Sequence, residues 1–375
     1  MFKLKLQKSD PRIRKILLAL LFISAFAIGS FGSLFYLNFI NNFMKSKPSL
    51  NQQDQIPSLP KTSYNFLLLG YGGAGHDGGT LSDAIVIVNV NPDKKKVTLI
   101  SIPRDLWVEI PVRSDIKEKY KINHAYAIGL DDTRYPLKEP QYKGEGGGAT
   151  MAKKVVGEVF GMVPDYYISV DFGGFKNIID ILGGVEVDVP VAFDDSFYPI
   201  KGKENDTCGK SAGEIARLHS LYSDTQLHHQ FECRYENIHY DKGMKHMDGE
   251  TALKFVRSRA SLQHGGDFAR SQRQQALLLA VKEKLFSMNA VKKIDELFNE
   301  FAKMIETDLD IKTIKGLVKV LGEMEEYKVS FIGLNEDNAL VSTKSLDGQF
   351  ILIPKEGEVI WGGVQKYIFE LINAD

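Results

Sequence analysis

The chain has 375 residues, of which 43% are hydrophobic and 25% are charged, so it is long and apolar enough to bury a large core. Its 47 lysines and arginines nearly balance its 48 aspartates and glutamates, and the formal net charge is −1. This balance excludes the broad basic surface that is typical of nucleic-acid-binding proteins. We therefore expect no nucleic-acid partner, and we expect any anion site to be local.

The N-terminal region has the pattern of a membrane signal anchor. Residues 1–15 form a basic tail with six basic side chains and one acidic side chain, and residues 16–44 carry no charge. The uncharged stretch is long enough to span a bilayer, and its basic flank predicts a cytoplasmic N-terminus. A cleaved signal peptide is the alternative, because Ala25-Phe26-Ala27 resembles a cleavage site. We predict a single-pass cell-membrane protein whose C-terminal domain is extracytoplasmic.

After a polar, proline-containing linker at 45–62, short apolar runs alternate with helical periodicity. Buried strands are predicted at 65–69, 84–88, 97–102, 166–170 and 185–189, and helices at 123–129, 150–160 and 175–182. This alternation predicts an α/β domain at 63–290 in which a central, mostly β sheet is flanked by helices.

The alternation breaks down at 193–247, which we interpret as a polar, loop-rich insertion without an assigned role. The insertion contains Cys208 and Cys233, the two cysteines of the chain. An oxidising compartment would let them pair, and the residues alone leave open whether they do. A zinc site is a weaker interpretation, because the spacing of the two cysteines matches no usual ligand pattern.

Helical periodicity returns after the insertion. Helices are predicted at 249–257, 267–288, 290–306 and 311–325, followed by strands at 327–332 and 348–353 and a helix at 364–372. We expect residues 291–375 to form a C-terminal α/β extension packed on the same domain.

Charged residues stand at the ends of two predicted strands. Asp83 directly precedes the strand at 84–88, and Arg104 and Asp105 follow the strand at 97–102. If these strands pair, the three side chains meet at one rim of the sheet, where α/β proteins place their sites. A simple ion pair between Arg104 and a neighbouring acid explains these residues equally well.

A cluster of cationic and amide side chains is the strongest indication of an anionic ligand. Arg257 and Arg259 lie at or just after the end of one predicted helix. Arg270, Arg273 and Gln274 lie three and four residues apart on the next predicted helix and therefore share one face. Planar guanidinium groups suit the oxygens of phosphates, which predicts an anion site. Local salt bridges and helix-dipole contacts are the structural alternative.

These residues belong to a longer pattern that resembles the LytR-CpsA-Psr (LCP) family over roughly residues 64–290. In chain order the matching stretches are Leu81-Ser82-Asp83, Ser101-Ile102-Pro103-Arg104-Asp105, Lys121-Ile122-Asn123-His124-Ala125-Tyr126, Asp171-Phe172-Gly173-Gly174-Phe175, Leu182-Gly183-Gly184-Val185, Asp248-Gly249-Glu250-Thr251-Ala252-Leu253, Arg257-Ser258-Arg259, and Asp267-Phe268 with Arg270, Arg273 and Gln274. The resemblance implies an extracytoplasmic α/β enzyme that holds a polyprenyl chain in an apolar tunnel. Such a phosphotransferase moves a polyprenyl-(pyro)phosphate-linked glycopolymer, as in teichoic acid or capsule attachment, onto peptidoglycan and releases polyprenyl phosphate.

The resemblance also implies roles for single residues. Those on the substrate pyrophosphate are Arg104, Lys121, Arg257, Arg259, Arg270, Arg273 and Gln274. Asp83, Arg104 and Asp105 would act in catalysis, with an aspartate as candidate base, and Asp83 would bind Mg²⁺ or Mn²⁺. Tyr71-Gly72 stand where the family usually has an acid, and Leu81 stands where it has an arginine. Asp77 is the candidate for the missing metal ligand.

Two other functions use the same arginines. A non-catalytic envelope protein would bind anionic lipid or polymer as a regulator or scaffold, and a polyprenyl-pyrophosphate hydrolase would release its product to water. Turnover with a peptidoglycan acceptor distinguishes the transferase from both.

Overall fold

The computed structural model of the chain describes residues 63–74, 78–222, 224–287, 301, 303–310, 313, 317 and 327–374. The predicted membrane segment at 16–44, the linker at 45–62, Asp77 and most of the predicted helices at 290–306 and 311–325 lie outside these residues. Within the described ranges, no helix combines the length and the apolar character needed to cross a membrane.

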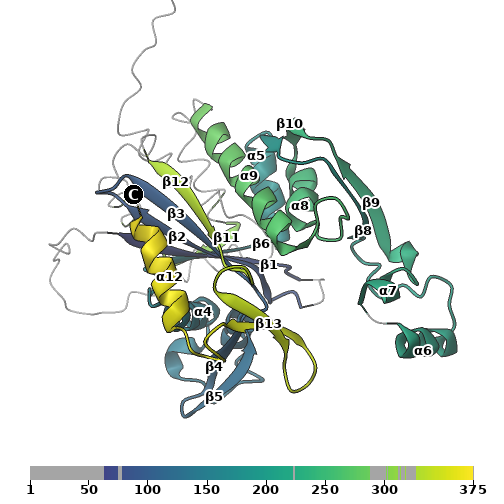
Figure 1. Ribbon diagram of the computed structural model, residues 1–375, viewed down its shortest axis with the longest axis horizontal. Helices are drawn as coiled ribbons and strands as arrows, with labels where there is room; N and C mark the ends of the chain where they lie inside the picture. Colours follow the sequence, from purple (N-terminus) through teal and green to yellow (C-terminus); the bar gives the residue numbers. More distant parts are fainter. Residues whose placement is uncertain are drawn as a thin grey trace, which may run out of the picture.

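A six-stranded mixed sheet in the order β11-β6-β1-β2-β3-β12 forms the centre of the fold (Figure 1). Its strands are β1 (Tyr64–Tyr71), β2 (Ser82–Asn91), β3 (Lys96–Ile102), β6 (Tyr166–Asp171), β11 (Ile305–Thr307) and β12 (Lys328–Gly333). The strands β1, β2 and β3 are antiparallel neighbours, whereas β6 runs parallel to β1 and β12 parallel to β3. Nearly every residue of β2 is buried, as expected for a strand that is covered on both faces.

Two apolar cores lie on opposite faces of this sheet. Side chains alternate along β1, so Phe66 and Leu68 belong to one core and Leu67 and Leu69 to the other. One face, called here the α9 face, packs against α5 (Phe172–Ile181), α8 (Gly249–Arg257) and α9 (Gly266–Ser287). The opposite face, the α4 face, packs against α3 (His124–Leu130), α4 (Gly147–Phe160) and α12 (Gly362–Asn373). The predicted architecture of a central sheet flanked by helices is therefore confirmed.

The short strand β11 is held in the sheet by side chains as well as by its backbone. Glu306 accepts hydrogen bonds from the hydroxyl groups of Tyr126 (2.7 Å) and Tyr167 (3.2 Å). Tyr126 belongs to α3 and its ring lies 5.1 Å from the ring of Tyr71 in β1. Strand β11 is thus tied to the α4 face close to the end of β1.

Two hairpins and one helical turn complete the α4 side of the molecule. They are β4 (Trp107–Arg113) with β5 (Ile116–Lys121), β13 (Leu340–Lys344) with β14 (Phe350–Pro354), and the 3-10 turn η1 (Pro140–Tyr142). The sequence pattern predicts neither β4 nor β5. Strand β5 is missed because its first four side chains are exposed and Ile116 is the one apolar residue among them, so this strand has no apolar alternation.

The insertion at 193–247 contains more regular structure than its polar composition predicts. Two antiparallel pairs frame it: β7 (Val185–Val189) with β10 (Gly243–Met247), and β8 (Phe193–Pro199) with β9 (Tyr235–Tyr240). Between β8 and β9 lie the short helices α6 (Ala212–Leu221), α7 (Asp224–His228) and η2 (Glu232–Arg234). Figure 1 shows that β8 and β9 lead away from the α9 face and carry α6 and α7 at the far end. We call this hairpin and its helices the arm.

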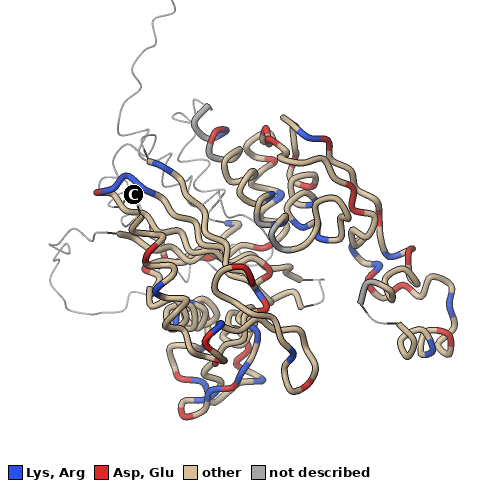
Figure 2. Tube along the Cα trace, in the orientation of Figure 1, with Lys and Arg blue, Asp and Glu red and all other residues tan. Residues whose placement is uncertain are grey.

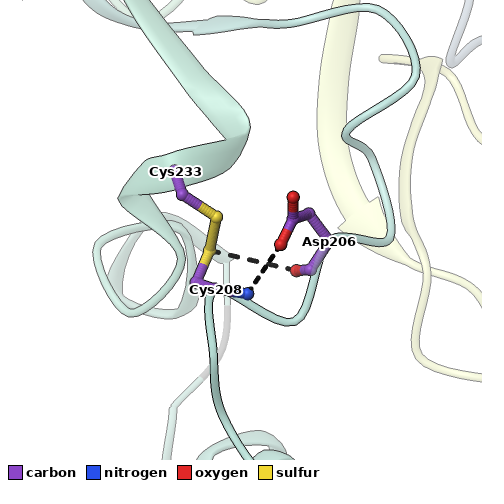
Figure 3. A group of neighbouring side chains, drawn as sticks. All are labelled: Asp206, Cys208 and Cys233. Atoms are coloured by element: carbon purple, nitrogen blue, oxygen red, sulfur yellow. Dashed lines mark hydrogen bonds between the residues drawn. A yellow bond between two sulfur atoms is a disulfide. The ribbon is translucent and has the colours of Figure 1, made fainter.

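A disulfide closes the outer part of the arm (Figure 3). It joins Cys208 to Cys233 with their Cα atoms 5.7 Å apart, and Asp206 Oδ1 accepts a hydrogen bond of 2.8 Å from the Cys208 backbone N–H. The two sulfur atoms are bonded to each other and are not thiolate ligands. The disulfide, and not a zinc ion, is therefore the cross-link of this loop.

Candidate active site

Three charged residues that the sequence places at strand ends form one network with Lys121, which only the family resemblance names, at the end of the sheet. Asp83, near the start of β2, lies beside the end of β3. The two strands are antiparallel, with Ile85 opposite Ile102. Arg104 Nη1 donates a hydrogen bond to Asp83 Oδ1, and Arg104 Nε lies 3.6 Å from Asp105 Oδ2. The opposite oxygen of Asp105 accepts a hydrogen bond of 2.6 Å from Lys121 Nζ. We call these residues the rim network: Asp83, Arg104, Asp105 and Lys121.

The two acids of the rim network differ in exposure. The side chain of Asp105 is 12% exposed and lies between Lys121 and Arg104, whereas that of Asp83 is 42% exposed. A buried carboxylate between two cations is suited to orient them. Asp83 is therefore the acid of the network that a ligand can reach, and Asp105 fixes the positions of the two basic side chains.

Backbone hydrogen bonds hold the segments that carry the rim network. The Asn123 N–H, at the start of α3, donates to Arg104 O (3.4 Å), and the Ser82 N–H donates to Asn123 O (3.2 Å). The Ile122 N–H donates to Leu106 O (2.7 Å). The start of β2, the turn after β3 and the start of α3 are thus joined, so the network rests on a fixed frame.

The donor set at this rim fits a magnesium ion that is bound mainly through a substrate. Magnesium in phosphate sites usually has one or two protein carboxylates, and water and phosphate oxygens complete its shell. Asp83 supplies one accessible carboxylate. Tyr71, which is opposite Ser82 across β1 and β2, and the following Gly72 supply none. The proposed second ligand, Asp77, lies outside the described residues.

Arg257 lies at the same end of the sheet, on the α9 face. Its guanidinium carbon is 3.9 Å from the centre of the Phe172 ring, and its Nη1 donates a hydrogen bond of 3.1 Å to the Tyr198 hydroxyl. Phe172 directly follows Asp171, which is paired with Tyr71 in β1. Since neighbouring strands lie about 4.8 Å apart, β6 and β2 are separated by roughly 10 Å. The rim network and Arg257 therefore lie along one edge, where β6, β1 and β3 end and β2 begins.

The other predicted pyrophosphate ligands lie on α9 and the loop before it. Arg259 is half-buried in that loop, and Arg270 and Gln274 are half-buried one turn apart on α9. Both signs of charge are spread over the described chain, and the central strands are mostly uncharged (Figure 2). Neither sign of charge therefore dominates the described chain, in keeping with the near-zero net charge of the sequence.

Arg273 has a different environment from Arg270 and Gln274, although helical spacing groups the three. Its side chain is fully buried, and its guanidinium carbon lies 4.6 Å from the centre of the Phe193 ring. It donates hydrogen bonds to Ser258 O and to His264 O, the latter 2.7 Å long. Burial lowers the pKa of Arg273 to about 10. In this structure the side chain binds carbonyl groups of the protein itself.

Asp171 is a residue at the same edge to which sequence reasoning gave no role. It is 3% exposed and caps α5, where its side chain accepts a hydrogen bond of 3.3 Å from the Gly174 N–H. Burial raises the pKa of Asp171 to about 7. Burial also raises the pKa of its strand neighbour Tyr71 to about 12. The signal in the sequence was an aspartate between a predicted strand and a predicted helix, which is typical of an N-cap.

Comparisons with known proteins agree with this architecture. The sequence model of the LytR_cpsA_psr family matches residues 33–358. The polyisoprenyl-teichoic acid–peptidoglycan teichoic acid transferase TagV of Bacillus subtilis is 26% identical over 288 residues, which make up 76% of this chain and 59% of that protein. The matched chain thus spans about three fifths of TagV. The enzyme of the same activity named TagU in Enterococcus faecalis is 23% identical over 347 residues, 90% of this chain and 93% of that protein.

A solved structure shows the same fold. The crystal structure of B. subtilis TagV has a TM-score of 0.54 to this chain at 23% sequence identity, and the superposition covers 84% of this chain and 100% of that one.

Proposed function

The chain belongs to the LytR_cpsA_psr family, and from that premise we propose that it is a membrane-anchored, extracytoplasmic glycopolymer phosphotransferase. It would take a glycopolymer from a polyprenyl-(pyro)phosphate carrier, attach it to peptidoglycan and release polyprenyl phosphate. The relatives TagV and TagU are named as teichoic acid transferases, and these names support this reaction class. The membrane anchor of this proposal is the uncharged segment at 16–44.

The observation that carries the proposal is the grouping of cations at one edge of the sheet. Arg104 and Lys121 stand at the ends of β3 and β5, and Arg257 stands at the end of α8, beside β6. Guanidinium and ammonium groups stabilise the charge that develops on phosphate oxygens during phosphoryl transfer. Arg259, Arg270 and Gln274 are proposed to extend this surface to both phosphates of a pyrophosphate.

In the proposed reaction, a hydroxyl group of a peptidoglycan sugar attacks the phosphorus atom that carries the polymer. The bond from that phosphorus to the oxygen bridging the two phosphates breaks, and polyprenyl phosphate leaves with the bonding electrons. Because the transition state of such transfers is loose, the protein contributes mainly positioning and charge stabilisation. The attacking hydroxyl loses its proton, and Asp83 is the solvent-accessible acid of the rim network that can accept it.

Each residue of the rim network has a distinct part in this proposal. Arg104 and Lys121 would bind phosphate oxygens while Asp105 holds both in place. A magnesium or manganese ion held by Asp83 would supply further positive charge to the phosphates. The polyprenyl chain would lie in an apolar tunnel of the domain, as the family resemblance implies.

A reconstituted reaction tests the proposal. Full-length protein in detergent, a lipid-linked oligosaccharide, a peptidoglycan fragment and magnesium should yield polyprenyl phosphate and tagged fragment in equal amounts. The double variant Arg257→Ala and Arg270→Ala should lose activity. Arg134→Ala, which removes an arginine that is 79% exposed and bound to Asp131, is the matched control.

The same assay separates the alternatives. Release of polyprenyl phosphate without an acceptor would show a hydrolase. Binding of the lipid that never leads to turnover, with equal affinity in the presence and absence of magnesium, would show a regulator or scaffold. Full activity of the double variant would remove the assigned roles of both arginines.

A further inference from the structure

We infer that β8, the first strand of the arm, is a functional part of the anion site, because its Asp195 and Tyr198 position Arg259 and Arg257. The inference rests on the proposed function and deepens it by adding two positioning residues. Neither residue belongs to the stretches that carry the family resemblance. Both lie in the segment to which sequence analysis assigned no role.

Asp195 is a buried acid whose hydrogen bonds converge on the loop that carries Arg259. It is 1% exposed. Its Oδ2 atom accepts three hydrogen bonds, from Ser258 Oγ (2.6 Å), the Arg259 N–H (3.1 Å) and the Ala260 N–H (3.1 Å). Its Oδ1 atom accepts a fourth, from the Phe197 N–H (3.0 Å). A buried carboxylate is stable only with such partners, so the loop and the acid fix each other.

Tyr198 holds the side chain of Arg257 directly. It is 4% exposed, and its hydroxyl oxygen accepts the hydrogen bond of 3.1 Å from Arg257 Nη1. Burial raises the pKa of Tyr198 to about 12, so the hydroxyl stays protonated near neutral pH. Together with the Phe172 ring at 3.9 Å, this bond fixes both the plane and the rotation of the guanidinium group.

A bulge in β8 lets two residues three positions apart act on neighbouring targets. In a regular strand, Asp195 and Tyr198 would point to opposite faces, because side chains alternate. The register between β8 and β9 shifts between these two residues, and both side chains are buried, whereas the intervening Ser196 is exposed. The extra residue thus turns Tyr198 toward the same side as Asp195, as bulges beside functional sites often do.

Arg273, on α9, also binds the loop that carries Arg259. Asp195 binds the N–H groups of the loop, and Arg273 binds its carbonyl groups, at Ser258 and at His264. Burying either charge alone would be unfavourable, and the opposite charges of Asp195 and Arg273 compensate one another. The loop is therefore held between a strand of the arm and α9, with its conformation set before a ligand binds.

The test compares substrate affinity with turnover in two full-length variants. In Tyr198→Phe, the loss of one hydrogen bond to a charged group should raise KM for the lipid-linked substrate by about tenfold. The kcat should fall by a smaller factor, because Arg257 keeps its contact with the Phe172 ring, and the KM for the peptidoglycan fragment and the thermal midpoint should stay near wild-type values. Asp195→Asn should raise the same KM further, by roughly 30-fold or more, because it weakens three bonds to the loop. Asp195→Asn should also lower the thermal midpoint, because it removes the charge that compensates Arg273, so the decisive quantity is the KM of the folded variant for the lipid-linked substrate. A purely structural role would leave this KM unchanged.

A matched control and a direct binding measurement make the outcome clear. Tyr235→Phe alters a half-buried tyrosine of the same arm, which contacts the Phe197 ring, and it should change neither affinity nor stability. Binding of a short prenyl pyrophosphate, measured by calorimetry, should weaken in Tyr198→Phe and Asp195→Asn and not in Tyr235→Phe.

The binding measurement also separates this inference from the proposed function. If the wild-type protein binds the prenyl pyrophosphate in a Tyr198-dependent way and never transfers a polymer, the transferase assignment fails and the inference stands. If transfer is observed and Tyr198→Phe binds the probe like the wild type, the inference is overturned. No binding of the probe by the wild-type protein overturns the inference, whereas the transfer assay decides the proposed function.

Discussion

Arg257 is stacked on Phe172, with its guanidinium carbon 3.9 Å from the centre of the ring, so the last residue of α8 rests on the first residue of α5. Phe172 is continuous with β6, and its neighbour Asp171 is paired with Tyr71 in β1. The contact therefore places Arg257 at the edge of the sheet where β1 and β6 end.

Lysine at position 257 should not provide the substrate binding that arginine provides. Arg257→Lys keeps the positive charge, but it loses the planar group that stacks on Phe172 and the fork that binds two phosphate oxygens. We expect KM for the lipid-linked substrate to rise about tenfold or more, since a stacked, partly buried cation contributes on the order of 1–2 kcal/mol. Steady-state kinetics measure this change, with Arg134→Lys as the control. Equal KM values in wild type and Arg257→Lys would contradict the stacking role.

Removing the accessible acid of the rim network should lower turnover and alter the response to metal. In Asp83→Asn the carboxylate that is proposed to bind the ion and accept the proton is lost, so we expect kcat to fall by about 100-fold or more. The remaining activity should require a higher magnesium concentration. Titration of magnesium into protein treated with a chelator measures both effects. A wild type that is fully active in excess chelator would rule out the metal site.

The buried Asp171 should make stability depend on pH. Its pKa is about 7 in the folded chain against 3.8 for an ordinary aspartate, so between these values the unfolded chain is ionised and the folded chain is protonated. The free energy of unfolding should therefore fall as pH rises from about 4 to about 7, by an amount on the order of 1–4 kcal/mol, and then level off.

Asparagine at position 171 isolates this contribution. Asp171→Asn can still accept the hydrogen bond of the Gly174 N–H, so the cap of α5 is retained without an ionisable group. Denaturant unfolding at pH 5 and at pH 7.5 should show a smaller loss of stability in the variant than in the wild type. The same loss in both proteins would mean that Asp171 does not titrate in this range.

The disulfide should stabilise the arm without setting the geometry of the arginines. The loop closed by Cys208 and Cys233 excludes Asp195 and Tyr198, which lie nearer the base of the arm. The double variant Cys208→Ser and Cys233→Ser should lose about 2–4 kcal/mol in the local stability of the arm. Limited proteolysis between 209 and 232 should become faster, while KM for the lipid-linked substrate changes less than twofold. A large increase in that KM would show that the tip of the arm controls the site.

The sequence pattern predicts three members of the rim network, Asp83, Arg104 and Asp105, because local rules are enough to place them once the two strands pair, whereas Lys121 is named only by the family resemblance. Asp83 and Arg104 follow from two apolar strands that are adjacent in sequence, and adjacent strands usually pair. The central strands and α8 are found for the same reason. Strand β5 is missed because its exposed side chains show no alternation, and β11 has three residues, which is too short for a periodic pattern.

The positions of the arginines on α9 depend on contacts that no local pattern contains. Helical spacing places Arg273 near Arg270 and Gln274, but burial is decided by the partners that pack against each side chain. Arg273 is covered by Phe193 of the arm and by the loop before α9. A bulge interrupts the alternation of side chains along β8. The sequence pattern therefore does not indicate that Asp195 binds this loop.

The two outer strands of the central sheet, β11 and β12, are the last two of its six strands to be synthesised. Until residues 305–333 emerge, the outer sides of β6 and β3 have no strand to pair with, and the nascent chain carries two open edges. Parallel pairing of Lys96 with Lys328 also joins residues that are far apart along the chain, which makes this step slow. In the proposed topology the domain folds after export, so its two open edges would need protection from self-association until residues 305–333 arrive.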